Sequence, residues 1–204
     1  MKSAEHHNNG HKRQQLILAS SSPFRKELLH RLGLPFNAIP PQADETPLPG
    51  ESPESLVARL AGTKAHAVAQ QHSDALIIGS DQVAVLDGEM LGKPGNHDNA
   101  VKQLTNASGK RVEFLTGLCL LNSTTRRMQV DVIPFAVVFR VLSAAQIENY
   151  LRREQPYSCA GSFKSEGLGI ALFDKLEGED PTALIGLPLI SLVRMLEHED
   201  VRII

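Results

Sequence analysis

Short apolar runs alternate along the chain with segments in which apolar residues recur every three or four positions. A short apolar run predicts a buried strand, and the longer period predicts a helix with one apolar face. The expected strands cover residues 16–19, 75–86, 112–121 and 128–141. The expected helices cover residues 23–32, 53–71 and 98–107, a segment after residue 143, and residues 187–197. This alternation favours an α/β fold with a mixed sheet and flanking helices.

Serines and prolines mark where several of these elements begin or end. Ser22 followed by Pro23 is typical of a helix start, because serine caps the helix and proline fits its first turn. Ser143 and Gln146 have the spacing of a capping box. Pro134 interrupts the last long strand, and since proline cannot donate to a sheet we expect it at an edge or a bulge.

The composition is that of an ordinary globular protein. The 204 residues are 42% hydrophobic and 22% charged, and the formal net charge is −2. A chain so close to neutral has no global field that draws it to nucleic acid or to an anionic membrane, so we expect neither as a partner. Residues 1–15 are polar and are expected to form a disordered tail, which leaves a single domain over residues 16–204.

Cysteine content and hydropathy favour a cytoplasmic location. Cys119 and Cys159 are too few for a disulfide framework, so free thiols in a reducing compartment are the default expectation. No apolar run approaches the roughly 18 residues that a membrane-spanning helix needs. The first residues also lack the apolar segment of a secretory signal.

Arg25 occupies an unfavourable position unless it binds an anion. It falls in the first turn of a helix, where the dipole is positive, and on the side of the apolar Leu28 and Leu29. Its guanidinium would form an anion site with the hydroxyl groups of Ser20 and Ser21 and the free N–H groups of the helix start. The alternative is an arginine that extends over the surface or pairs with a carboxylate.

Lys64 and Asp81 are charged residues in apolar surroundings. Lys64 follows the apolar stripe of its helix, so its ammonium group either extends to solvent or faces a cavity that holds negative charge. Asp81 interrupts an apolar strand, where a carboxylate is costly unless a cation, a donor or a metal meets it. Gly79 would permit a bulge that redirects this side chain. The alternative is a turn between two shorter strands, with Asp81 capping a loop.

Three further residues are weaker candidates. Glu45 follows Asp44 in a proline-bounded loop, and paired carboxylates suit a hard cation, although an acidic surface loop is the commoner explanation. Lys93 and Lys164 lie in glycine-rich loops, which can enclose phosphate, but neither loop matches the phosphate-loop pattern. The common zinc, serine-nucleophile and dinucleotide-binding motifs are absent from the sequence. The remaining basic and acidic residues suit a polyphosphate with a metal and a general base nearby.

Six stretches of the sequence resemble the Maf nucleotide pyrophosphatases and follow the order typical of that family. They are LILASSSPFR (16–25), DET (44–46), GSDQV (79–83), LGKP (91–94), CAGSFKSEG (159–167) and GLPL (186–189). The resemblance implies a two-lobed α/β fold around a central cleft, often a homodimer, with one catalytic domain over residues 16–204. It also implies hydrolysis of the α–β phosphoanhydride of a nucleoside triphosphate to the monophosphate and pyrophosphate, with a divalent cation, Mg²⁺ or Mn²⁺.

The resemblance assigns roles by position. Asp81 corresponds to the proton acceptor, and together with Glu45 it corresponds to the metal site. The groups expected around the triphosphate are Ser20, Ser21, Arg25, Lys64, Lys93 and Lys164.

Three positions indicate a subgroup that prefers 7-methyl-GTP. They are Phe24, Gln82 and Glu166. The branch that acts on dTTP and UTP typically has Ala-Asp-Thr at residues 80–82 and glutamine in place of Glu166. The 7-methyl-GTP branch often carries Trp where this chain has Phe24, and either ring could stack on a base. The Glu166 carboxylate could accept hydrogen bonds from N1 and N2 of guanine, and the cationic methylated ring would favour both contacts.

A second function stays open on the sequence alone. The family has been linked to inhibition of septum formation on overproduction, which suggests a nucleotide-binding regulatory protein with secondary hydrolysis. An assay for pyrophosphate with nucleotides and Mg²⁺ separates the two functions.

Overall fold

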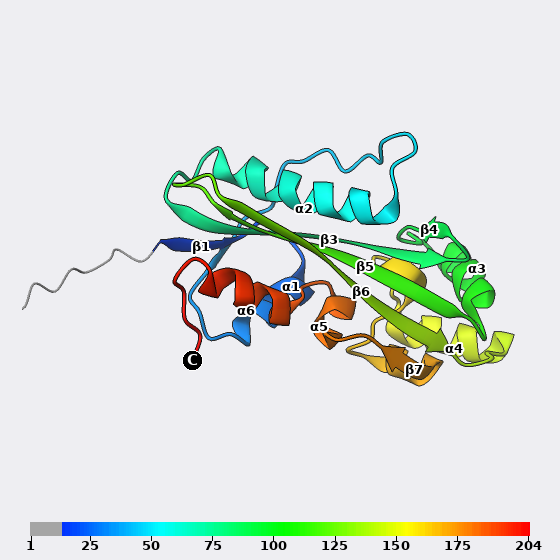
Figure 1. Ribbon diagram of the computed structural model, residues 1–204. Helices are drawn as coiled ribbons and strands as arrows, with labels where there is room; N and C mark the ends of the chain where they lie inside the picture. Colours follow the sequence, from blue (N-terminus) through cyan, green and yellow to red (C-terminus); the bar gives the residue numbers. More distant parts are fainter. Residues whose placement is uncertain (1–13) are drawn as a thin grey trace, which may run out of the picture.

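A seven-stranded mixed sheet runs through the computed structural model, which describes residues 14–204 (Figure 1). The strands are β1 (Gln15–Leu18), β2 (Asn37–Ala38), β3 (Ala75–Leu86), β4 (Glu89–Leu91), β5 (Arg111–Asn122), β6 (Met128–Phe139) and β7 (Phe173–Glu177). Their order is β2-β1-β3-β5-β6-β7, with β4 paired to β3. Strand β1 is parallel to β2 and β3, and the other pairs are antiparallel. The expected mixed α/β class is confirmed.

Helices cover both faces of this sheet. They are α1 (Pro23–His30), α2 (Pro53–Ala69), α3 (His97–Ala107), α4 (Ala144–Glu154), α5 (Pro181–Ile185) and α6 (Leu189–Glu197). Figure 1 shows α2 along one face of the long strands, with α1 and α6 near one end of the opposite face and α3 and α4 near the other end. The two ends form the expected lobes, and β3 and β5 pass continuously between them. No helix within residues 14–204 has the length and apolar character needed to cross a bilayer.

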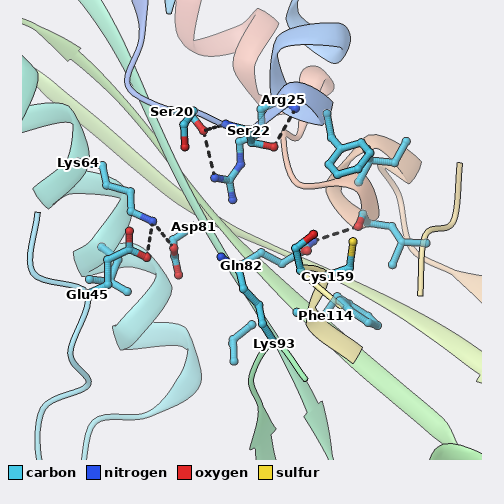
Figure 2. A pocket seen from close by; sticks show the side chains of 18 of the residues that line it. Ser20, Ser22, Arg25, Glu45, Lys64, Asp81, Gln82, Lys93, Phe114 and Cys159 are labelled. Atoms are coloured by element: carbon cyan, nitrogen blue, oxygen red, sulfur yellow. Dashed lines mark hydrogen bonds and ion pairs between the residues drawn. The ribbon is translucent and has the colours of Figure 1, made fainter. Parts of the chain in front are cut away.

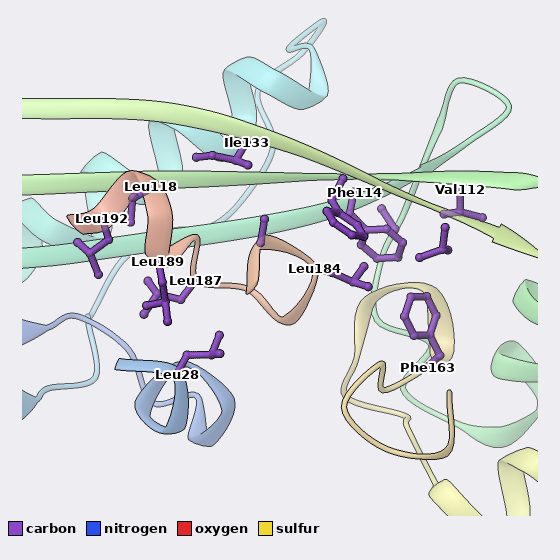
Figure 3. Close-up of a cluster of buried hydrophobic side chains, with 14 of the residues drawn as sticks. Leu28, Val112, Phe114, Leu118, Ile133, Phe163, Leu184, Leu187, Leu189 and Leu192 are labelled. Atoms are coloured by element: carbon purple, nitrogen blue, oxygen red, sulfur yellow. The ribbon is translucent and has the colours of Figure 1, made fainter. Parts of the chain in front are cut away.

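The sheet divides the hydrophobic core into a large and a small part. On the large side, Leu28 of α1 and Leu192 of α6 are packed in one cluster with Leu118 of β5, and the same cluster extends to Phe114 and Phe163 (Figure 3). On the other side, the apolar stripe of α2 packs against β1, β3 and β5. Side chains of β3 that point to opposite faces of the sheet therefore lie among different helices.

Helix α2 lies unusually close to the sheet at two glycines. A Cβ atom on Gly79 would lie 2.0 Å from the carbonyl oxygen of Ala61, and one on Gly117 would lie 2.1 Å from that of Val57. The structure does not use the bulge that Gly79 would permit, because this residue pairs in regular register with Cys119. Glycine is needed there because helix backbone occupies the place of a side chain. The close packing fixes the distance of α2 from the strand that carries the candidate carboxylate.

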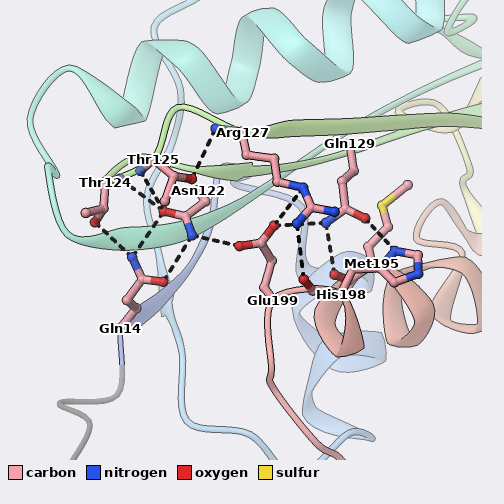
Figure 4. Close-up of polar contacts among 9 residues, drawn as sticks. All are labelled: Gln14, Asn122, Thr124, Thr125, Arg127, Gln129, Met195, His198 and Glu199. Atoms are coloured by element: carbon pink, nitrogen blue, oxygen red, sulfur yellow. Dashed lines mark hydrogen bonds and ion pairs between the residues drawn. The ribbon is translucent and has the colours of Figure 1, made fainter.

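The ends of the chain are tied to the sheet by a polar network (Figure 4). Asn122 is buried, and its amide donates to Glu199 (2.7 Å) and exchanges hydrogen bonds with Gln14. Strand β1 begins at Gln15, which is the last residue of the expected tail. Residues 1–13, where the disordered tail was expected, lie outside the described residues.

Most expected element boundaries agree with the structure to within one or two residues. Ser22 and Ser52 cap α1 and α2, and Ser143 and Gln146 form the capping box of α4. Helix α6 begins at Leu189, two residues after its expected start. The sequence did not predict the short β2, β4, β7 and α5. Two short 3₁₀ turns, Ala160–Ser162 and Leu168–Leu172, lie in and beside the segment expected to be a glycine-rich loop.

Pro134 lies at an edge of the sheet, as expected. Strand β7 pairs with β6 from Ala136 to Phe139, so Pro134 is beyond the end of that pairing. The neighbouring N–H group of Val132 donates to the side chain of Asp131 (2.9 Å). Because proline lacks an N–H group and Val132 has used its own, this edge offers few donors to another strand, which opposes edge-to-edge association.

Candidate active site

A cavity of about 660 Å³ contains most of the residues singled out in the sequence. Figure 2 shows Glu45, Lys64 and Asp81 on one side of it and Phe114 and Cys159 on the other, with Gln82 between them. One side of the cavity is therefore charged, whereas the other presents an aromatic ring and a thiol. This division suits a ligand that joins a charged chain to a flat ring.

Lys64 bridges the two predicted carboxylates on the charged side. Its Nζ atom lies 2.6 Å from Oδ1 of Asp81 and 2.9 Å from Oε2 of Glu45. The side chains of Lys64 and Asp81 are 7% and 12% exposed, whereas that of Glu45 is 55% exposed. Asp81 lies within β3, so the alternative of a turn between two strands is wrong. The buried charges meet partners of opposite sign, as burial requires.

The same pair of carboxylates fits a divalent cation. Glu45 and Asp81 come from distant segments, yet an oxygen atom of each approaches a single positive nitrogen. Hard oxygen atoms are the ligands that Mg²⁺ and Mn²⁺ prefer. Within residues 14–204, no group of three or more His, Cys, Asp or Glu side chains is placed to hold a metal ion. The other ligands of a bound Mg²⁺ would therefore be water and phosphate oxygens, as is usual for this ion.

The start of α1 forms the upper wall of the cavity in Figure 2. The Ser20 hydroxyl accepts from the N–H group of Ser22 (3.1 Å), and the Ser22 hydroxyl accepts from that of Arg25 (3.4 Å). Two N–H groups that the sequence suggested for an anion are therefore already bonded. Ser20 is buried, whereas Ser21 is exposed at the cavity wall. An anion bound at this helix start would therefore depend more on side chains than the sequence implied.

Arg25 is held from two sides. Its Nε atom donates to the carbonyl oxygen of Gly186 (2.8 Å), and Nη1 lies 3.5 Å from the hydroxyl of Ser20. Burial lowers the pKa of the Arg25 guanidinium, and the nearby charges of Asp81 and Glu45 oppose that shift. A guanidinium keeps its charge in proteins. The structure therefore places a partly buried cation at the cavity, where a phosphate could pair with it.

The residues predicted to select the base also meet in the cavity. Phe24, Gln82 and Glu166 all line it. The Gln82 Nε2 atom donates to the carbonyl oxygens of Ala183 (2.8 Å) and Leu184 (3.1 Å). These bonds fix the orientation of the amide and leave Oε1 as its available acceptor among the described residues. Glu166 is exposed and adds a carboxylate to the cavity wall.

The two lysines of the glycine-rich loops, Lys93 and Lys164, differ in whether they reach the cavity. Lys93 is exposed and lines the cavity. Lys164 does not line it, because its Nζ atom donates to the carbonyl oxygen of Glu154 (3.0 Å) and lies 3.4 Å from the carboxylate of the same residue. Glu154 ends α4, and the negative end of a helix attracts a cation. The structure therefore does not support the expectation that Lys164 surrounds the phosphates.

Several cavity residues were missed in the sequence. Leu184 and Ile185 belong to the unpredicted α5, and Phe114 looks like any other core residue of its strand. Thr116 does not line the cavity but bonds to α5 behind its wall, and it could have been noticed because it is a polar residue inside the apolar run of β5. Cys159 lines the cavity, but burial raises the pKa of its thiol, so it is not an activated nucleophile.

Comparisons with known proteins show the family of this chain. A sequence profile described as Maf-like protein matches residues 15–199. The chain is 61% identical over 183 residues to a 7-methyl-GTP pyrophosphatase of Nitrosococcus oceani. The aligned residues are 90% of this chain and 92% of that protein. It is 58% identical over 188 residues to a protein of the same name from Pseudomonas aeruginosa. Here the aligned residues are 92% of this chain and 98% of that protein. The chain therefore belongs to the Maf family.

Proposed function

We propose that this protein hydrolyses the α–β phosphoanhydride of nucleoside triphosphates, with 7-methyl-GTP as the preferred substrate. The observation that carries the proposal is the composition of one cavity, which is lined by Arg25, Lys93 and the Lys64–Asp81 pair and also by Phe114, Leu184 and the carboxylate of Glu166. A triphosphate fits the charged side and a purine fits the other. The names of the relatives support the same substrate.

The chain's own groups account for the reaction steps. Arg25 and Lys93 bind the phosphate oxygens and offset their charge. Asp81 accepts the proton of the attacking water, whose oxygen bonds to the α-phosphorus while the bond to the bridging oxygen breaks. Lys64 orients the carboxylate of Asp81 through their contact of 2.6 Å. The products are the nucleoside monophosphate and pyrophosphate.

A divalent cation held by Glu45 and Asp81 is part of the proposal. When bound, Mg²⁺ or Mn²⁺ would supply positive charge that polarises the phosphoryl group. The exposed position of Glu45, on a loop without regular structure, leaves this carboxylate free to move from Lys64 toward an entering ion.

A substrate panel tests the proposed function. The chain is incubated with Mg²⁺ and 7-methyl-GTP, GTP, UTP or dTTP, and the released pyrophosphate is measured. We expect the highest kcat/KM for 7-methyl-GTP. Tight nucleotide binding without pyrophosphate would instead favour the regulatory function. The homodimer and the cytoplasmic location stay predictions, and sedimentation of the purified chain would test the first.

Glu166→Gln is expected to weaken the preference for 7-methyl-GTP over UTP. The substitution removes the charge that favours a cationic ring and replaces one acceptor oxygen with a donor. Because hydrogen bonds to charged groups contribute about 1.5–3 kcal/mol, the ratio of the two kcat/KM values should fall roughly tenfold or more. Glu179→Gln is the matched control, since Glu179 is exposed and does not line the cavity. An unchanged ratio would remove Glu166 from base recognition.

A further inference from the structure

The C-terminal end of α5 binds side chains from three other elements. The carbonyl oxygen of Gly186 accepts from the hydroxyl of Ser80 (2.8 Å) and from Nε of Arg25 (2.8 Å). The carbonyl oxygen of Ala183 accepts from the hydroxyl of Thr116 (2.9 Å) and from Nε2 of Gln82. The Ala183 carbonyl also accepts from the backbone N–H group of Gly186 (3.0 Å). Carbonyl groups at the end of a helix have spare acceptor capacity, and these side chains use it.

These contacts decide where α5 lies. The helix has five residues, and a helix this short is unstable in isolation. Its other end is capped by Asp180, which also accepts from the N–H group of Ile190 in α6 (2.8 Å). The carbonyl end is held by Ser80, Thr116 and the amide of Gln82. Loss of one of these donors should therefore let that end of the helix shift.

Strand β3 connects this helix to the catalytic carboxylate. Side chains alternate between the two faces of a strand. Asp81 points toward Lys64 of α2, whereas Ser80 and Gln82 on either side of it bind the carbonyl end of α5. The same short segment thus positions the proton acceptor on one face and α5 on the other.

Ser80 and Thr116 act on the ligand only through α5. Both are fully buried, with 0% exposure, so neither can touch a substrate in the cavity. Leu184 and Ile185 of α5 line the cavity. Because its carbonyl groups are bonded within the protein, this wall contributes apolar side chains to a bound base. A shift of α5 would change the shape of that wall.

We propose that Ser80 and Thr116 are positioning residues for base selectivity. They hold α5 so that its Leu184–Ile185 wall fits the preferred purine, and the Thr116 hydroxyl also accepts from Nε2 of Gln82 (2.9 Å) beside it. The inference rests on the proposed function, since it concerns the selectivity of that same cavity. It assigns specificity to two hydroxyl groups that lie behind the wall of the cavity.

The test compares selectivity in Ser80→Ala and Thr116→Val with the wild-type protein. The readout is the ratio of kcat/KM for 7-methyl-GTP to that for UTP, measured well below the unfolding temperature. A typical net hydrogen bond of about 1 kcal/mol corresponds to roughly a fivefold change, so we expect the ratio to fall about fivefold in each variant. Partial unfolding lowers both values equally and leaves the ratio unchanged, which separates positioning from stability.

Two matched variants serve as controls. Thr116→Ser keeps the hydroxyl group and should retain most of the wild-type ratio. Ser123 follows β5, and its hydroxyl exchanges hydrogen bonds with the backbone of Ala75. It does not line the cavity, so Ser123→Ala should leave the ratio unchanged. Unchanged ratios in both Ser80→Ala and Thr116→Val would overturn the inference.

Binding measurements keep this test independent of turnover. Dissociation constants for 7-methyl-GTP and UTP give the same ratio without hydrolysis. If the wild-type chain releases no pyrophosphate but the binding ratio falls in both variants, the proposed function fails and the inference is supported. If the wild-type chain is active and neither the kinetic nor the binding ratio changes, the inference fails and the proposed function stands.

Discussion

Asp81→Asn is expected to lower kcat by about 10²–10⁴-fold, the usual contribution of a general base. The amide has nearly the shape of the carboxylate, but it cannot accept the proton of the attacking water and is a poorer metal ligand. Lys64 keeps its contact with Glu45 and can still donate to the amide oxygen. We therefore expect the fold to be retained, which thermal unfolding would show, while single-turnover and steady-state assays report the loss.

Asp174→Asn is the control for this substitution. Asp174 is exposed on β7 and does not line the cavity. The same chemical change there should leave kcat unaltered. If Asp81→Asn retained kcat within tenfold of the wild type while remaining folded, Asp81 would not be the proton acceptor.

Gly79→Ala is expected to destabilise the protein by about 3 kcal/mol, at the upper end of what overpacking costs. The added Cβ atom would lie 2.0 Å from the carbonyl oxygen of Ala61, and this contact involves backbone that no side-chain rotation can relieve. Relief requires α2 to move away from the sheet. Because Lys64 is on α2, the folded fraction should also lose activity.

Gly62→Ala is the matched control, because it makes the same change on α2 itself. The nearest atom to its added Cβ would be Sδ of Met128 at 3.7 Å, an ordinary contact. Alanine is preferred over glycine inside a helix by about 0.5–1 kcal/mol, so this variant should be neutral or more stable. Urea unfolding measures both free energies. A loss below about 0.5 kcal/mol in Gly79→Ala would show that α2 does not depend on this close approach.

Features with a local cause were predictable from the sequence. The start of α1 depends on Ser22 and Pro23, and the start of α4 on Ser143 and Gln146, which lie within four residues of one another. The edge position of Pro134 follows from its missing N–H group. Strand β2 and helix α5 were missed because two to five residues carry too little periodicity to be recognised. Their existence depends on partners far away in the chain.

The sequence by itself determined the class of fold, the main helix starts and the set of charged residues that a polyphosphate site would use. Tertiary structure decided which of these residues meet. It joined Lys64 to Asp81 and Glu45, and it turned Lys164 toward the end of α4. It also gathered Ser80, Thr116 and Arg25 around α5. The physical reason is the distance in sequence over which each interaction acts. Helix caps and apolar periods act between neighbours in the chain. A buried hydrogen bond or ion pair instead depends on which groups from distant segments the packed sheet and helices bring together.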